Sequence, residues 1–172
     1  GTPAWEREIA VAIQAAQATP SIERVVVSTD DDAIAQTARE YGAAVPFMRP
    51  AHLAADHSPE WAAWQHAIQT LQADDPAFEI MASVPTTAPL RRPEDVQACI
   101  EKLEQTRADL VLTVTPAASN PYFSMVRLEG TRAQLAIPPE QGLARRQDAP
   151  VVYDIAPLAY VMWTDYVLHN HH

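Results

Sequence analysis

The stretch RVVVSTDDDAIAQTAREYG, residues 24–42, decides the fold class. Its opening run, RVVVS, is rich in β-branched residues and is typical of a strand buried in a parallel sheet. Residues 31–42 then place apolar side chains at helical spacing, and the pattern stops at Gly42. A strand that leads directly into a helix indicates an α/β protein, and three aspartates stand at the junction.

These three aspartates, Asp30–Asp32, admit more than one interpretation. Ligands of open α/β sheets bind at the carboxyl ends of strands, so an acidic Mg²⁺ and phosphoacceptor pocket of the response-regulator type is one candidate. That pocket also needs an aspartate at the end of a later strand and a lysine at the end of the last, and neither is found. We therefore expect Asp31 and Asp32 to cap the following helix and fill its first turn, with Asp30 facing the crevice.

Length and composition limit the class of protein to which the chain can belong. The 172 residues suit one domain, and 48% of them are hydrophobic. No apolar run approaches the roughly 20 residues that span a bilayer, and no signal-peptide pattern opens the chain. The single cysteine, Cys99, lies at helical spacing among apolar residues, which predicts a buried structural thiol. We expect a cytoplasmic protein.

Charge and residue usage exclude several activities. A formal net charge of -10 argues against binding nucleic acid or anionic membranes by general attraction. With only four glycines, the sequence holds no glycine-rich phosphate loop. Its single lysine, Lys102, lies on the polar face of an expected helix. A reaction that needs a catalytic lysine would have to take it from outside this sequence.

Helices and strands are expected to alternate along the first two thirds of the chain, which predicts a layered sheet with right-handed crossovers. The expected helices are residues 4–17, 31–42, 59–71 and 93–105, and the expected strands are residues 24–28, 44–48, 78–84 and 108–115. After residue 115 the pattern changes to a hairpin that turns near Glu129 and Gly130, followed by a loop and an apolar strand at 158–163. This later part is too short to bury a core alone.

Four stretches carry a family resemblance over nearly the whole chain. They are RVVVSTDDDAIAQTAREYGA (24–43), VPFMRPAHLAADHSPEWAAWQHAI (45–68), VPTTAPLRRPEDV (84–96) and RRQDAPVVYDIAPLAYV (145–161). In this order and spacing they resemble the sugar-acid cytidylyltransferases, the CMP-N-acylneuraminate synthetase family. The resemblance implies a Rossmann-like α/β fold of the nucleotide-diphospho-sugar transferase type. Its sheet would be mostly parallel and three-layered, with a β-hairpin dimerisation extension.

This resemblance also implies a division of the chain and a reaction. Residues 1–115 would form the nucleotide-binding core, 116–150 the dimerisation extension of a homodimer, and 151–172 the return to the core. Members of the family couple CTP to a nonulosonic sugar acid with Mg²⁺ and release pyrophosphate. Catalysis of this kind rests on positioning and on electrostatic stabilisation of the phosphate oxygens.

Four residues match nucleotide-binding positions of the family. Arg49 corresponds to the residue that hydrogen-bonds the cytosine edge, where a planar fork suits the acceptors of a pyrimidine; a solvated loop arginine is the alternative. Ser58 falls where backbone and hydroxyl groups read the base, although this segment could equally begin the next helix. Thr87 keeps its residue type in the loop that matches QPTSPLR of other members. Asp30 would form a wall of the nucleotide crevice.

Four further residues match sugar-binding positions. Arg91 keeps its type in the same loop, whereas the family's sugar-contacting glutamine is Pro85 here, which bears on the identity of the sugar. Arg146 and Gln147 correspond to extension residues that approach the sugar carboxylate across the dimer interface, where a bidentate arginine would suit the anion and a solvated arginine is the alternative. Tyr160 matches the tyrosine of the family's NGAIY motif.

Two family features have no counterpart in the sequence: the initial strand with its lysine-bearing phosphate loop, and the final D-x-D segment that carries Mg²⁺. We therefore expect no metal ligand and no catalytic phosphate-loop residue in this chain, and no activity from the chain alone. Two alternatives remain open at this point. One is a nucleotidyltransferase of the same fold with another sugar or base, and the other is a catalytically dead module that binds a nucleotide or sugar.

Overall fold

The computed structural model describes residues 3–55, 58–138 and 145–171, with the exception of the side chain of Arg146. The helices are α1 (Ala4–Gln17), α2 (Asp32–Glu40), α3 (Glu60–Gln72), α4 (Pro93–Thr106) and α5 (Thr164–His169), with 3-10 turns η1 (Ala51–Leu53) and η2 (Arg146–Asp148). The strands are β1 (Ile80–Ser83), β2 (Leu110–Pro116), β3 (Val126–Glu129), β4 (Arg132–Leu135) and β5 (Tyr153–Trp163). None of the helices within the described ranges has the length and apolar character that crossing a membrane requires.

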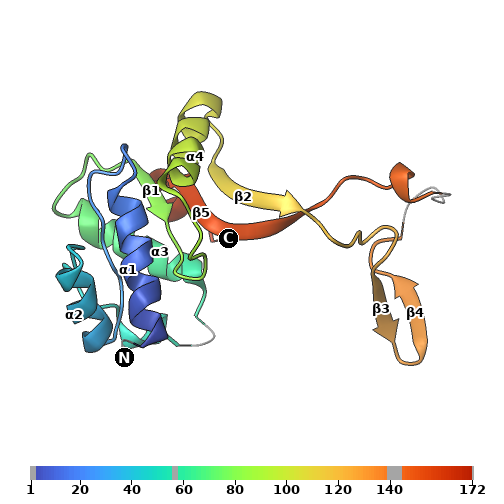
Figure 1. Cartoon of the computed structure of the whole chain (residues 1–172), viewed down its shortest axis with the longest axis horizontal. Coiled ribbons are helices and arrows are strands. Elements are labelled where there is room, and N and C mark those ends of the chain that lie inside the picture. Colours follow the sequence, from blue (N-terminus) through green and yellow to red (C-terminus); the bar gives the residue numbers. More distant parts are fainter. Residues whose placement is uncertain (1–2, 56–57, 139–144, 172) are drawn as a thin grey trace. The chain divides into compact units, whose positions relative to one another are not determined.

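The chain forms two compact units. Unit 1 consists of Gly1–Thr113 and Pro157–His172, and unit 2 consists of Val114–Ala156. The division predicted from the sequence, after residues 115 and 150, assigns a function to each part: nucleotide binding, dimerisation and the return to the core. That assignment stays a prediction. Within unit 1, α1 packs against both α2 and α4 (Figure 1).

The main sheet has the strand order β1-β5-β2. Strands β1 and β5 pair antiparallel, in a register that runs from Ile80 opposite Trp163 to Ser83 opposite Tyr160. The two strands predicted at 24–28 and 44–48 are reduced to a single parallel bridge, Val26 to Ala44. The α/β class is confirmed, but a mostly parallel sheet is not, because β5 returns beside β1 in the opposite direction. One antiparallel strand beside parallel ones is common in mixed sheets.

Three apolar clusters hold unit 1 together. In the first, the buried face of α4 with Val96, Cys99 and Leu103 lies against Ala159 and Val161 of β5. The second joins α1 to α2 and to the strand-like segment 25–27, and the third joins α3 to β5 and α5. Burial, and secondarily the charge of Asp95, raises the pKa of the Cys99 thiol. The prediction of a buried structural cysteine is confirmed.

Local signals account for the start of α2. Asp31 is its N-cap, and its Oδ1 accepts hydrogen bonds from the N–H groups of Ala33 at 2.7 Å and Ile34 at 3.0 Å. Asp32 lies in the first turn, where a negative charge complements the helix dipole. The expected roles of Asp31 and Asp32 are confirmed. Past the helix end, Gly42 adopts a φ of +83°, a left-handed conformation that glycine accepts without strain.

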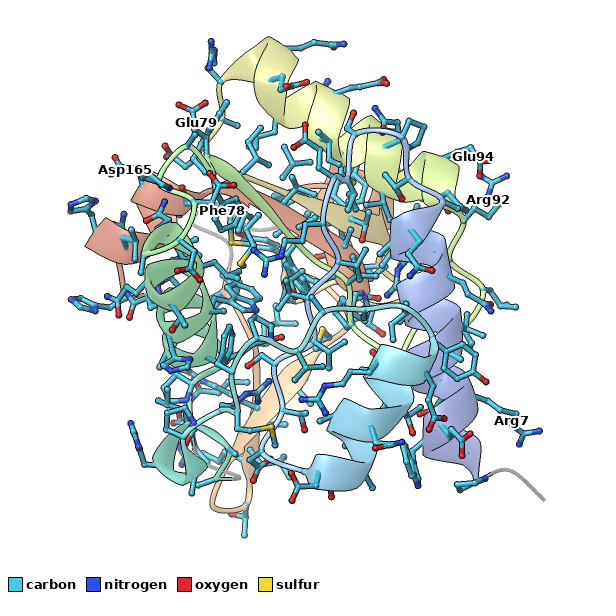
Figure 2. The ribbon with its side chains drawn as sticks, turned by 90° about the vertical axis from the view of Figure 1, so that its left-hand side faces the viewer. Arg7, Phe78, Glu79, Arg92, Glu94 and Asp165 are labelled. Carbon is cyan, nitrogen blue, oxygen red and sulfur yellow. The ribbon has the colours of Figure 1, made fainter. Side chains whose placement is uncertain are left out.

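The start of α4 and the hairpin also follow their sequence signals. Pro93 occupies the first turn of α4, and the Asp95 carboxylate accepts the N–H of Arg92 at 3.2 Å. At the exposed N-terminus of α4, Arg92 and Glu94 are labelled in Figure 2. In unit 2, β3 and β4 pair antiparallel around a two-residue turn in which Gly130 has a φ of +63°.

Candidate active site

Arg49 is fixed to the end of the strand-like segment by three hydrogen bonds. Its main-chain N–H donates to the carbonyl of Thr29 at 2.8 Å. Its Nε donates to Ser28 Oγ at 3.1 Å, and its Nη2 donates to the carbonyl oxygen of Ser28. Both Arg49 and Ser28 are partly buried. The loop after the second predicted strand therefore presents its arginine at the carboxyl end of the first, where α/β proteins bind ligands.

Asp30 directly follows Ser28 and Thr29, the two residues that bond Arg49. Thr29 is buried, and its hydroxyl accepts the N–H of Asp31 at 3.1 Å. The Asp30 side chain is exposed and forms no hydrogen bond or ion pair with any residue in the described part of the chain. Its neighbour Asp31 is committed to the helix cap. Asp30, which precedes the helix, is thus available to a ligand at the end of the strand-like segment.

Ser58 lies at the end of the segment that follows Arg49. Its Oγ donates to the carbonyl of His52 at 2.6 Å, and its N–H donates to the carbonyl of Ala55 at 2.8 Å. The short helix η1 starts after Pro50, whose carbonyl accepts the N–H of Leu53 at 2.8 Å. Ser58 therefore closes the turn before α3, and a direct role in reading a base stays a prediction.

Arg91 is buried, with 6% of its surface exposed. Its Nε donates to the carbonyl of Leu158, and its Nη2 donates to the carbonyls of Pro85 and, at 3.4 Å, of Pro157. Burial without a carboxylate partner lowers the pKa of this guanidinium. The side chain ties the loop before α4 to β5 within unit 1, so its described contacts are all to main-chain oxygens. Contact with a sugar stays a prediction.

The same loop exposes several side chains. Thr87 lies exposed in a turn, and Leu90 is 91% exposed. Arg91, at the end of the loop, bonds the carbonyl of Pro85 at the start of the loop and the carbonyl of Leu158 on β5. Thr87 therefore lies on a segment that is held at both ends. Its predicted contact with the nucleotide is not tested by any described interaction.

Tyr160 lies on β5 and pairs with Ser83 of β1. Its ring is partly buried and packs at a tilt on Trp64 of α3, with the ring centroids 5.8 Å apart. Trp64 in turn contacts Trp61 at 5.5 Å. Tyr160 therefore joins an aromatic cluster on the inner side of α3. It follows Leu158, a partner of Arg91, along the same strand.

The two remaining predicted residues belong to unit 2. Gln147 is exposed within η2, and the side chain of Arg146 lies outside the described residues. Nearby, Arg145 and Asp148 form an exposed ion pair at 3.1 Å. The predicted site residues thus fall into a group around Arg49, a group around Arg91, and the pair in η2.

The described residues offer no preformed metal site of three or more protein ligands. Over the ranges that the structure describes, no three histidine, cysteine or acidic side chains are close enough to hold one. The acidic run does not supply them, since Asp31 is used as a cap.

Sequence reasoning missed two residues of this region. Ser28 holds the Arg49 guanidinium, and its place at the carboxyl end of a predicted strand was the signal that could have found it. Trp64 packs on Tyr160, and the helical spacing of its segment could indicate only which face it lies on. Neither partner is close to its residue in the sequence.

A family model described as cytidylyltransferase matches residues 9–156. The chain belongs to the cytidylyltransferase family. Among curated relatives it is similar to a CMP-N,N'-diacetyllegionaminic acid synthase of Campylobacter jejuni, with 33% identity over 165 residues that cover 94% of this chain and 68% of the relative. It is also similar to a pseudaminic acid cytidylyltransferase of the same species, with 31% identity over 107 residues that cover 62% and 46%.

Solved structures agree on the fold of this cytidylyltransferase family member. A CMP:2-keto-3-deoxy-manno-octonic acid synthetase, complexed with CTP, superposes with a TM-score of 0.62 at 15% sequence identity. The superposition covers 93% of this chain and 64% of the synthetase chain. A 4-diphosphocytidyl-2C-methyl-D-erythritol synthase from Anaerococcus prevotii gives 0.61 at 12% identity, covering 94% and 61%. At such identities the likeness establishes the α/β nucleotidyltransferase fold alone. The chain spans less than two thirds of the length of both structures.

Proposed function

We propose that the protein transfers CMP from CTP to the anomeric hydroxyl of a nonulosonic sugar acid and releases pyrophosphate. The observation that carries this proposal is the 33% identity to a CMP-N,N'-diacetyllegionaminic acid synthase along 94% of the chain. The arrangement of Arg49 supports it, because a partly buried guanidinium is fixed at the ligand-binding end of a strand.

In this reaction the anomeric oxygen attacks the α-phosphorus of CTP, and the bond from that phosphorus to the bridging oxygen of pyrophosphate breaks. The hydroxyl proton leaves with solvent or a base, so a CMP-sugar and pyrophosphate are formed. Arg49 would bind the cytosine through its planar fork, and Asp30, Ser58 and Thr87 would line the nucleotide site. Arg91 and Tyr160 would support the sugar site, with Arg146 and Gln147 reaching the sugar carboxylate.

Mg²⁺ belongs to the proposal for the whole protein. It would neutralise charge on the phosphate oxygens when bound. Since the described residues hold no cluster of three metal-ligating side chains, no step of the reaction is assigned to them through the metal.

We further propose that the protein is a cytoplasmic homodimer that associates through unit 2. Unit 2 exposes large apolar side chains in its hairpin and in the segment that returns from it, among them Leu128 at 74%, Val151 at 77% and Ile155 at 60%. Exposed apolar groups gathered on one small unit are typical of an interaction surface. A monomeric mass of the full-length protein by light scattering at micromolar concentration would refute the dimer.

The proposed reaction predicts pyrophosphate release. Full-length protein incubated with CTP, Mg²⁺ and one of sialic, legionaminic, pseudaminic or 2-keto-3-deoxy-octonic acid should release pyrophosphate with at least one of them, measured by a coupled pyrophosphatase assay. The matched control omits the sugar and should give only background. Confirmed CTP binding without release for any sugar acid would leave a binding module as the better account.

A further inference from the structure

The hydrogen bonds of Arg49 divide its guanidinium into two edges. The Nε and Nη2 atoms, which point to the same side, bind the Oγ and the carbonyl oxygen of Ser28. One Nη2 hydrogen and both Nη1 hydrogens remain. Among the described residues no acceptor is found for Nη1, so the outer edge formed by Nη1 and Nη2 is free to bind a ligand.

Ser28 therefore does more than occupy the end of a strand. A single side-chain bond would let the guanidinium rotate, whereas two acceptors from one residue fix both its position and its plane. The N–H of Arg49 also donates to Thr29, so the backbone and the side chain of Arg49 are held by consecutive residues. The direction of the outer edge is set by Ser28.

The outer edge suits a ligand with two adjacent acceptors, and at the proposed nucleotide site the base is such a ligand. It offers two parallel N–H donors, and the pyrimidine edge of cytosine offers two adjacent acceptors, N3 and O2. Uracil carries a hydrogen on N3, so the same two donors would meet one acceptor and one donor. A site built to make paired hydrogen bonds discriminates strongly against an analogue that cannot complete them.

We propose that Ser28 is a positioning residue that orients Arg49 so that its free edge selects cytosine over uracil. This rests on the proposed function in that Arg49 lies at the nucleotide site. It adds a residue and a selectivity that the position of Arg49 alone does not supply.

The test compares nucleotide binding by full-length protein and its variants, using isothermal titration calorimetry with CTP and with UTP. In Ser28→Ala the hydroxyl acceptor is lost and the carbonyl is kept, so we expect the Kd for CTP to rise about fivefold. The Kd for UTP should change by less than about twofold. Ser28→Thr, which keeps the hydroxyl, should restore the preference for CTP.

Ser21→Ala is the matched control. Its hydroxyl also accepts a side-chain hydrogen bond, from Gln97 Nε2 at 2.8 Å, but Ser21 precedes the strand-like segment, whereas Ser28 ends it and bonds Arg49. It should leave both dissociation constants unchanged. A Ser28→Ala variant that keeps the CTP preference, or loses CTP and UTP affinity equally, overturns the proposal, as does equal loss in Ser28→Thr.

Binding and turnover separate this proposal from the proposed function. A protein that prefers CTP through Ser28 yet releases no pyrophosphate with any sugar acid would support the role of Ser28 and refute the transfer reaction. A wild-type protein that releases pyrophosphate while Ser28→Ala keeps its CTP preference would do the reverse. A protein that binds neither nucleotide would overturn both.

Discussion

Replacing Arg91 with leucine should destabilise the protein by about 3 kcal/mol, because three main-chain carbonyls lose a charged donor in a buried place. The guanidinium connects Pro85 to Leu158 and Pro157 across the loop before α4. Leucine fills part of the volume but satisfies none of these oxygens. The free energy of unfolding of the full-length protein, from urea denaturation followed by tryptophan fluorescence, measures the effect.

Two further variants test whether the loss of stability comes from the hydrogen bonds of the Arg91 guanidinium. Arg91→Lys keeps the charge but has no fork that could reach Pro85 and Leu158 together, so it should recover only part of the loss. Arg7→Ala removes an arginine that is exposed on α1 (Figure 2), and we expect a change within about 0.5 kcal/mol. If Arg91 served the sugar alone, Arg91→Leu would keep the wild-type unfolding midpoint and lose only turnover.

Arg49→Ala should raise the Kd for CTP about tenfold or more, since the proposed paired contact from its guanidinium to the base would be lost. Calorimetric titration of the full-length protein with CTP measures the change. Arg39→Ala, an exposed arginine in the last turn of α2, is the control for net charge and should have little effect.

Arg49→Lys distinguishes the fork from the charge. Lysine cannot offer two parallel N–H donors, so we expect it to bind CTP nearly as weakly as alanine does. Wild-type affinity in the lysine variant would show general attraction to the triphosphate and would remove Arg49 from the base site. An unchanged Kd in Arg49→Ala would do the same.

Features set by neighbouring residues were predictable from the sequence. The Asp31 cap, the start of α4 at Pro93 and the turn at Gly130 depend on groups only a few residues apart. Their signals are therefore complete within a short window of sequence. The burial of Cys99 followed in the same way from helical spacing on α4.

The roles of the two arginines were not predictable to the same depth. Arg49 meets Ser28 across 21 positions, and Arg91 meets Leu158 across 67 positions. Such pairings depend on how the loops fold back onto the sheet, and residue type alone does not specify them. The antiparallel pairing of β5 with β1 likewise joins segments far apart in the sequence, Ile80 with Trp163.

The structure also changes how Arg91 is best understood. The family resemblance placed it among the sugar-binding residues, whereas its described bonds are to main-chain oxygens in unit 1. A buried clamp and a ligand contact have different consequences when the side chain is removed. The stability of Arg91→Leu therefore decides between them more directly than an activity assay.

Phosphorus NMR of a single reaction tests the central claim most directly. Full-length protein with CTP, Mg²⁺ and an accepted sugar acid should convert the CTP signals into one phosphodiester signal, from the CMP-sugar, and an equal amount of pyrophosphate. Free CMP and pyrophosphate without a phosphodiester would indicate hydrolysis. CDP with inorganic phosphate, or unchanged CTP with every sugar acid, would contradict transfer of CMP altogether.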